Sequence, residues 1–298
     1  MRPFAVTLVA LAIIAAAAGA RAQSVPAVPG VAQEKLFDYA PGSTTCAPQA
    51  NPAQGGATVR ISGPGATPLN ALVIAPAGSL KKAPAVLWVH WLGETATTNH
   101  TEFQSDALAL VKHGVVSMLV DMPWSEKDWF NTRTTDGDYA GTVAQVIALR
   151  RALDCLGAIP GVDKSRIAYV GHDFGAMVGV LLLAVDNRPS YAVLMAPTLS
   201  FWEWYLLGKQ PADPAAYVAQ MSVFDLPGWL AKGRQKATLL QVGQLDEYVS
   251  QATGIAIRNA IPARGRTLRA YKLDHALEDE TTHEDRLTWL VTQLAASP

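Results

Sequence analysis

The five-residue stretch 171–175, Gly-His-Asp-Phe-Gly, constrains the fold of this chain more than any other part of the sequence. Residues 166–170 before it are apolar and partly β-branched, which is typical of a buried parallel strand. Residues 176–184 after it form an apolar run long enough for a buried helix. Small residues at 171 and 175 let the strand and the helix pack closely, so that the middle side chain is pushed outward. Any strand-to-helix turn favours glycine, so the rest of the chain has to decide whether Asp173 at the apex has a function.

Segments with strand and helix patterns alternate along most of the chain. The expected strands are 57–62, 69–75, 85–90, 114–120, 166–170, 191–195, 237–242 and 267–273. The expected helices are 102–112, 139–156, 176–184 and 284–294. The first two strands read as an antiparallel pair, and the later alternation predicts an α/β fold with a mostly parallel sheet covered on both faces.

One segment, 198–235, interrupts this alternation. It is far longer than an ordinary connection between a strand and a helix, which has about 2–6 residues. It is also rich in large aromatic residues: Trp202, Trp204, Tyr205, Tyr217, Phe224 and Trp229. The segment is interpreted either as a small cap over the strand ends or as an extra helix that packs flat on the core.

The first 22 residues have the pattern of a signal peptide. Arg2 gives a positive start, residues 4–20 are an apolar run rich in alanine, and Ala-Arg-Ala at 20–22 fits a cleavage site. An uncleaved anchor is the alternative, although the run is slightly short of the about 20 residues of a spanning helix. We therefore expect a periplasmic or secreted protein without stable membrane association after cleavage.

The remaining chain divides into two parts of different composition. Residues 23–56 are rich in Pro, Gly, Ala and Gln and are expected to form an extended surface segment. Residues 57–298 are expected to form one α/β domain. The formal net charge of −1 and the lack of a basic run argue against a nucleic-acid partner or an acidic membrane.

The two cysteines, Cys46 and Cys155, leave two readings open. They could form a disulfide in an oxidising compartment, or Cys155 could be a buried apolar residue of its helix. Two lone cysteines form no metal signature, and no cofactor is expected.

Three residues whose side chains could take part in catalysis follow three expected strands. In chain order they are Asp173 in the turn, Asp246 after strand 237–242, and His275 after strand 267–273. Ligands bind at the carboxyl ends of strands in such sheets. The order nucleophile, acid, base is that of the α/β hydrolases.

Other residues compete for these roles with weaker arguments. Asp274 is the immediate neighbour of His275 and would point elsewhere from a strand end, while His283 falls at an expected helix start. His100 is a further candidate base. His172 is expected to pack beside the turn, and Asp121 to cap a turn beneath the site.

From Ala57 to its C-terminus the chain resembles the α/β-hydrolase superfamily. The stretch 161–176, Gly-Val-Asp-Lys-Ser-Arg-Ile-Ala-Tyr-Val-Gly-His-Asp-Phe-Gly-Ala, resembles the dienelactone-hydrolase-like branch in its framing, and Gly243-x-x-Asp246-x-x-Val249 matches the acid loop of that branch. The turn itself is similar to those of epoxide hydrolases and dehalogenases, in which the nucleophile is aspartate. The resemblance implies the α/β-hydrolase fold and a catalytic triad of Asp173, Asp246 and His275.

The resemblance also implies an oxyanion hole built from two backbone amides. One is the amide of Phe174, directly after the nucleophile. The family often has His-Gly-x-Gly after the first buried strand, whereas this chain has Trp91 in place of the first glycine, so Leu92 is expected to supply the second amide. Trp91 is then expected to line the substrate pocket, together with Trp202, Tyr205 and Tyr217.

An aspartate nucleophile limits the reactions that are feasible. Attack of a carboxylate on an ester gives a mixed anhydride, whereas attack on a saturated carbon gives an alkyl-enzyme ester that His275 can help water to hydrolyse. A small epoxide or alkyl halide is therefore the expected substrate. Epoxide opening is slightly favoured, because Tyr205 and Tyr217 could protonate the oxygen while Phe174 has no side-chain N–H for a halide. The alternatives are an ester or lactone hydrolase in which Asp173 is a general base for water, and an inactive binding protein.

Overall fold

The computed structural model describes residues 27–49 and 56–295, and within these residues nine strands form one sheet. The strand order is β1-β2-β3-β5-β4-β6-β7-β8-β9, in which the first four are joined antiparallel and the pairs from β5 onward are parallel. The strands are Thr45–Pro48 (β1), Ala57–Ser62 (β2), Leu69–Ile74 (β3), Ala83–Val89 (β4), Val116–Asp121 (β5), Val162–His172 (β6), Pro189–Met195 (β7), Ala237–Gly243 (β8) and Arg266–Tyr271 (β9). The predicted antiparallel start and mostly parallel sheet are confirmed.

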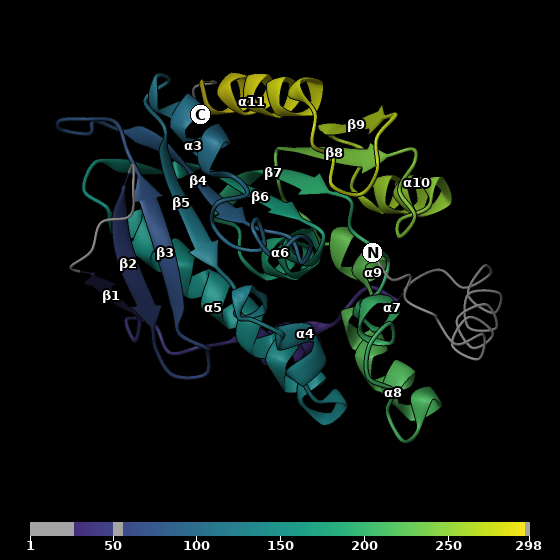
Figure 1. Cartoon of the computed structure of the whole chain (residues 1–298). Coiled ribbons are helices and arrows are strands. Elements are labelled where there is room, and N and C mark those ends of the chain that lie inside the picture. Colours follow the sequence, from purple (N-terminus) through teal and green to yellow (C-terminus); the bar gives the residue numbers. More distant parts are fainter. Residues whose placement is uncertain (1–26, 50–55, 296–298) are drawn as a thin grey trace.

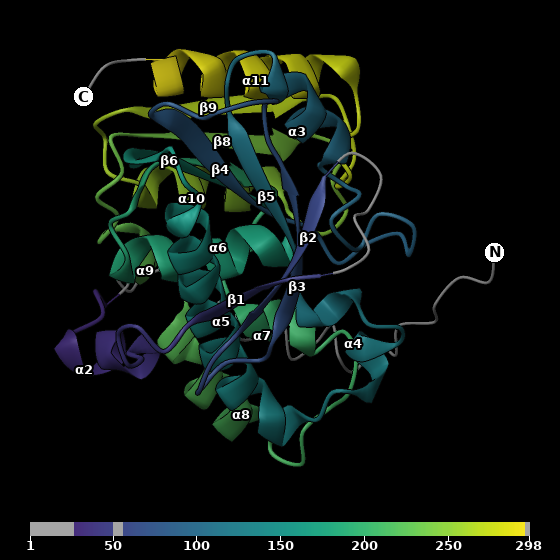
Figure 2. The same cartoon turned by 90° about the vertical axis from the view of Figure 1, so that its left-hand side faces the viewer.

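Helices cover both faces of this sheet (Figure 1). The helices are Val31–Glu34 (α2), Gln104–Val111 (α3), Trp129–Thr132 (α4), Asp138–Ala158 (α5), Phe174–Val185 (α6), Phe201–Tyr205 (α7), Pro214–Met221 (α8), Leu226–Leu230 (α9), Gln251–Ala260 (α10) and Glu280–Ala295 (α11). Helices α3 and α11 lie on one face, and α5 and α6 lie on the other (Figures 1 and 2). Among the described helices, none is long and apolar enough to cross a membrane.

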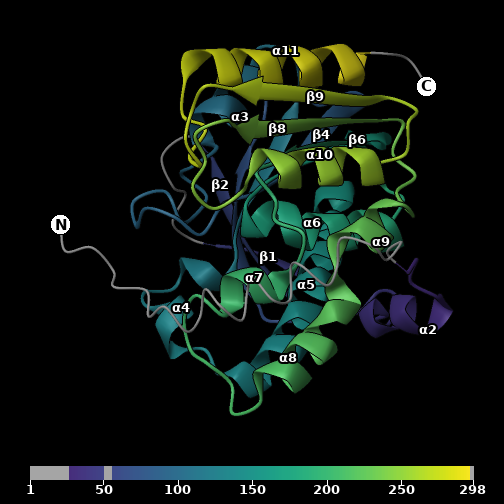
Figure 3. The same ribbon diagram turned by 90° about the vertical axis from the view of Figure 1, so that its right-hand side faces the viewer.

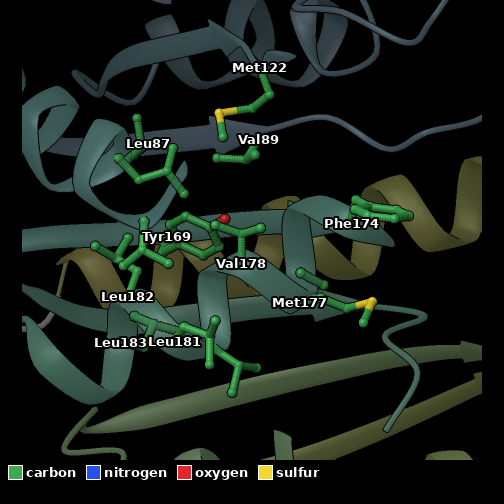
Figure 4. Packing of buried hydrophobic residues seen from close by; sticks show 14 of the residues in the cluster. Leu87, Val89, Met122, Tyr169, Phe174, Met177, Val178, Leu181, Leu182 and Leu183 are labelled. Atoms are coloured by element: carbon green, nitrogen blue, oxygen red, sulfur yellow. The ribbon is translucent and has the colours of Figure 1, made fainter. Parts of the chain in front are cut away.

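The two faces have separate hydrophobic cores because side chains alternate along each strand. In β4, Val86 and Trp88 pack in the core with α3 and α11, whereas Leu87 and Val89 pack in the core with α5 and α6. Figure 4 shows Leu87 and Val89 close to Tyr169 and to the apolar side chains of α6. This alternation explains why the strands read as continuous apolar runs: both of their faces are buried.

The segment 198–235 carries three short helices, α7, α8 and α9, between β7 and β8. Helices α7 and α8 lie at the lower end of the view, near α4 and α5, whereas α9 lies closer to α6 and α10 (Figures 1 and 3). Helix α9 packs against α6, and Phe201 and Tyr205 of α7 pack against Phe174. The aromatic residues of this segment are therefore largely buried next to the strand-to-helix turn.

The segment before the sheet differs from the expected extended surface chain. Residues 31–37 form α2 and a 3₁₀ turn, and Phe37 is buried against Trp229 of α9. Residues 45–48 form the edge strand β1, which pairs with β2. The buried Phe37 side chain and the pairing of β1 with β2 thus order a segment whose composition favours loops. The predicted signal peptide, 1–22, lies outside the described residues.

The two cysteines form a disulfide in the structure. Cys46 of β1 and Cys155 of α5 are bonded, with their Cα atoms 5.7 Å apart and a sequence separation of 109. Cys155 is also buried, so it combines the two roles that the sequence left open. The bond ties the edge of the sheet to the helix that covers it.

Candidate active site

Close packing around the turn after β6 fixes the position of Asp173. A Cβ atom on Gly171 would come within 2.5 Å of the Gly175 carbonyl oxygen, and one on Gly175 within 2.3 Å of the Val89 carbonyl oxygen. Only glycine fits at either position. Asp173 itself has φ 51° and ψ −116°, a left-handed conformation that non-glycine residues rarely adopt and that turns the side chain out of the strand direction. A hydrogen bond stabilises this strained conformation: the Asp173 N–H donates to the Met195 carbonyl at 2.9 Å.

The structure brings Asp173, His275 and Asp246 together. Nδ1 of His275 lies 2.7 Å from Oδ2 of Asp246, and Nε2 lies 3.7 Å from Oδ1 of Asp173. The Asp173 side chain is fully buried and His275 is 7% exposed. Within the described residues, Oδ1 of Asp173 and Nε2 of His275 are buried without hydrogen-bond partners. These two atoms therefore face each other across a gap that is too wide for a hydrogen bond.

The second oxygen of Asp173 lies at the expected oxyanion hole. The Leu92 N–H donates to Oδ2 of Asp173 at 3.1 Å. The Phe174 amide is in the first turn of α6, where a helix leaves its own N–H groups unpaired. The structure thus places both predicted amides at the turn, with a carboxylate oxygen already bound by one of them.

A neutral histidine fixes the loop that carries Leu92. Nδ1 of His90 donates to the Trp91 carbonyl at 2.8 Å, and Nε2 accepts the Met122 N–H at 2.9 Å. This pair of contacts defines the tautomer, because a carbonyl only accepts and an N–H only donates. Burial lowers the pKa of His90 to about 4, so its ring stays neutral near pH 7.

The charges of the site favour an ion pair between His275 and the two aspartates. Burial acts to lower the pKa of His275, but the facing carboxylates of Asp173 and Asp246 outweigh it and raise this pKa to about 9. Burial likewise opposes ionisation of Asp246, yet His275 and the N–H groups of Tyr248 and Val249 lower the pKa of its carboxyl. At neutral pH His275 is therefore charged in the described site, with the Asp246 carboxylate at its Nδ1.

Aromatic rings surround His275, and two of them were not selected from the sequence. The Trp204 ring lies 5.5 Å from the His275 ring and 6.1 Å from that of Phe174, and Tyr248 lies 5.3 Å from His275. Tyr248 is 60% exposed, so it borders the site on the solvent side. Trp91, which was predicted to line the pocket, lies 6.3 Å from His275. Helical spacing in α7 was the only available signal for Trp204, and it does not show which side of a five-residue helix faces the site.

The predicted pocket tyrosines are engaged elsewhere. The Tyr217 hydroxyl donates to Oδ2 of Asp138 at 2.6 Å, and the Tyr205 hydroxyl lies 3.4 Å from Oγ1 of Thr142. Burial raises the pKa of both tyrosines, which makes them weaker acids. Trp202 is buried in the core with α5 and α6. The structure thus places these three predicted pocket residues in the packing around α5 and α7.

The residues that competed for the triad roles have other partners. Nδ1 of His283 lies 2.8 Å from Asp106, and Nδ1 of His100 lies 2.8 Å from Asp121. Asp274 is exposed and accepts the N–H of Ala276. In the described part of the chain, no group of three or more His, Cys, Asp or Glu side chains is arranged to hold a metal ion.

Comparison with solved structures identifies the fold. An acetyl xylan esterase from Paenibacillus sp. is similar with a TM-score of 0.69 and 19% identity, over 88% of this chain and 92% of that chain. Acetyl xylan esterase 1 from Thermoanaerobacterium sp. is similar with a TM-score of 0.66 and 15% identity, over 91% and 96%. A Klebsiella pneumoniae protein described as a dienelactone hydrolase is similar with a TM-score of 0.57 and 15% identity, over 86% and 100%. No protein-family model and no curated protein sequence matches the chain. The chain therefore has the α/β-hydrolase fold, as the sequence predicted.

Proposed function

We propose that this protein is a small-molecule hydrolase in which Asp173 attacks a saturated carbon and forms an alkyl-enzyme ester. One observation carries the proposal: Oδ2 of Asp173 accepts the Leu92 amide at 3.1 Å, while Oδ1 is buried without a partner. A carboxylate held in this way has one oxygen bound as a future carbonyl oxygen and the other free to attack. Asp173 needs no base for this step, because the carboxylate itself is the nucleophile.

In the first step Oδ1 of Asp173 forms a bond to the substrate carbon while the bond to the leaving group breaks. The leaving group departs with the bonding electrons, and Oδ2 becomes the carbonyl oxygen of the new ester. Because this reaction removes the charge of Asp173, it also removes one of the two carboxylates that raise the pKa of His275. His275 then releases its proton to solvent and becomes available as a base.

In the second step the neutral His275 takes a proton from water, and the water oxygen attacks the ester carbonyl carbon. The negative charge grows on Oδ2, which is bound by the Leu92 amide and faces the N-terminus of α6. Collapse of this intermediate breaks the bond from carbon to the alcohol oxygen. The alcohol leaves with the proton of the new carboxyl group, and Asp173 returns as a carboxylate beside imidazolium.

The surroundings favour halide as the leaving group over an epoxide oxygen. Opening an epoxide needs an acid, and the hydroxyls of Tyr205 and Tyr217 are engaged with Thr142 and Asp138. A halide needs only hydrogen-bond donors. The indole N–H of Trp204 is buried without a partner in the described structure, and its ring lies 5.5 Å from His275. An unpaired buried N–H costs stability, so its retention next to the site supports a role as a donor to the leaving group.

The test uses the variant His275→Gln with short alkyl halides and epoxides as probes. This variant should be alkylated once and then stall, because loss of the base slows hydrolysis by about 10²–10⁴. Mass spectrometry of the peptide that contains Asp173 should show the adduct. In wild-type protein, a single turnover in ¹⁸O-water should place the label in the Asp173 carboxylate. Asp173→Asn is the matched control and should give neither adduct nor product.

A second candidate is an ester hydrolase in which Asp173 acts as a general base. The names of the structurally similar esterases favour it, although their identities of 15–19% are low. In that case the product would carry the solvent label from the first turnover and Asp173 would carry none, which would end the alkyl-ester mechanism. Absence of adduct and product with every probe would favour a binding protein of the same fold.

We also propose that the mature protein is exported to the periplasm or secreted. The disulfide between Cys46 and Cys155 supports this, because disulfides persist in oxidising compartments and are rare in the cytosol. It agrees with the signal-peptide pattern of residues 1–22.

A further inference from the structure

Two buried side chains, Glu102 and His172, join the three loops that carry the proposed catalytic groups. Oε2 of Glu102 accepts the Trp91 N–H at 2.7 Å, and Oε1 lies 2.7 Å from Nδ1 of His172. Nε2 of His172 lies 2.9 Å from the carbonyl oxygen of His275. The side chains of Glu102 and His172 are 12% and 1% exposed. This pair therefore links the loop of Leu92, the turn of Asp173 and the loop of His275.

These contacts require one more proton than a neutral histidine and a carboxylate provide. The carbonyl oxygen of His275 can only accept, so Nε2 of His172 must carry a hydrogen. A carboxylate oxygen can also only accept, and Oε2 of Glu102 already accepts the Trp91 N–H. The 2.7 Å contact between Nδ1 and Oε1 must then contain a second hydrogen, on one of these two atoms. Without it, two lone pairs would face each other in a buried place.

The surroundings stabilise this extra proton. The indole of Trp91 stacks on the His172 ring with centroids 5.1 Å apart and planes 7° apart, so an aromatic face covers this ring and shields it from water. Burial raises the pKa of Glu102. The other charged or titratable groups near the pair are Asp173 in the turn, His275 after β9 with Glu278 shortly after it, and Arg286 and His283 of α11 with their partner Asp106 of α3.

We propose that Glu102 and His172 hold one proton between them, and that this proton keeps the Leu92 amide and His275 aligned on Asp173. Both are positioning residues, because they act through the backbones of Trp91 and His275. The inference rests on the proposed roles of Asp173 and His275. Removal of the proton leaves two acceptors in contact. The hydrogen bonds to the Trp91 N–H and the His275 carbonyl then weaken, and the Leu92 amide moves out of line with Asp173.

Two substitutions at Glu102 separate this role from simple packing. Glu102→Ala leaves the Trp91 N–H and the His172 ring unpaired, and hydrolysis of the alkyl-enzyme should slow by about 10²–10³, as for loss of an oxyanion-hole donor. Glu102→Gln can accept the Trp91 N–H with its oxygen and donate its NH₂ to Nδ1 of a neutral His172. The hydrolysis rate of this variant should stay within about tenfold of the wild-type rate. In wild type the rate should fall at high pH as the shared proton is lost, and Glu102→Gln should not show this fall.

The deciding measurement is the proton count, which needs no substrate. NMR of protein labelled with ¹⁵N-histidine and ¹³C-glutamate should find, near neutral pH, Nε2 of His172 protonated and one further proton on Nδ1 or on the Glu102 carboxyl. In Glu102→Gln only Nε2 should be protonated. His90 is the internal control, with a proton on Nδ1 alone.

Two results would overturn the proposal. One is a wild-type His172 with a single proton beside an ionised Glu102. The other is a folded Glu102→Gln protein that is as slow as Glu102→Ala. Because the proton count does not depend on turnover, failure of the alkyl-ester mechanism would leave it measurable, and the two ideas can fail separately.

Discussion

At the scale of single residues, the convergence of Asp173, Asp246 and His275 was the most predictable part of this site. Asp173, Asp246 and His275 each follow a strand, and parallel strands end at one edge of a sheet, so chain order alone brings them together. From the sequence, Glu102 was placed at the start of the expected helix 102–112, whereas in the structure it lies in the turn before α3. Its importance comes from contacts with the segments around residues 91 and 172, which no local pattern encodes.

The raised pKa of His275 predicts a pH-dependent stability. Its ordinary value is 6.5 and its value in the folded protein is about 9, so the charged ring stabilises the fold fully below about pH 6.5. This contribution, about 3 kcal/mol, should be lost as the pH rises from about 6.5 through about 9. Urea unfolding of wild type and His275→Gln across this range measures it as the difference between the two. A difference that does not change with pH would show that His275 is not charged in the folded protein.

At the scale of elements, long apolar segments were predictable and short ones were not. The helix expected at 139–156 is α5, Asp138–Ala158. It was predictable because its apolar residues keep a helical spacing over a length that is unusual for a loop. Helix α7 has five residues, and its capping box at Ser200 and Glu203 is a weak signal among many polar residues. The orientation of Trp204 therefore had to come from packing against His275 and Tyr248.

Helix α7 contributes Trp204, the donor in the proposed halide mechanism. Trp204→Phe keeps most of the ring but removes the N–H, so alkylation of Asp173 by an alkyl halide should slow by about 10–100-fold, the cost of a hydrogen bond to a charged group. Trp88→Phe is the matched control. Its indole N–H is also buried without a partner among the described residues, but its ring packs on Phe103 in the other core. Equal rates for the two variants would remove Trp204 from the mechanism.

The disulfide supports the edge strand β1, which pairs only with β2 in the described sheet. Opening a covalent loop of 109 residues should lower the free energy of unfolding by about 2–5 kcal/mol. The double variant Cys46→Ser with Cys155→Ser measures this by urea unfolding. Wild type in the presence of a reductant should match the variant, and the variant itself should not respond to the reductant. Unchanged stability in both would mean that β1 is held by its strand pairing alone.

At the scale of the whole molecule, the alternation of strand and helix patterns was enough to predict an α/β fold with its sheet between two layers of helices. Export is a property of the whole chain that the fold does not test. The protein recovered from the producing cell should begin at or near Gln23, because cleavage is expected after Ala22. N-terminal sequencing decides this, and Met1 recovered from a membrane fraction would favour an anchor.

The contact between the Leu92 amide and Oδ2 of Asp173 has a consequence for chemical profiling. Fluorophosphonate probes label esterases by phosphorylating a serine hydroxyl while the phosphoryl oxygen enters an empty hole. In this protein the apex residue is Asp173, and its Oδ2 already binds the Leu92 amide. A phosphonyl group on a carboxylate would be a mixed anhydride that water destroys quickly. The protein should thus stay unlabelled in a serine-hydrolase survey despite its α/β-hydrolase fold, and the proposed mechanism predicts that a haloalkane-tagged reagent labels it.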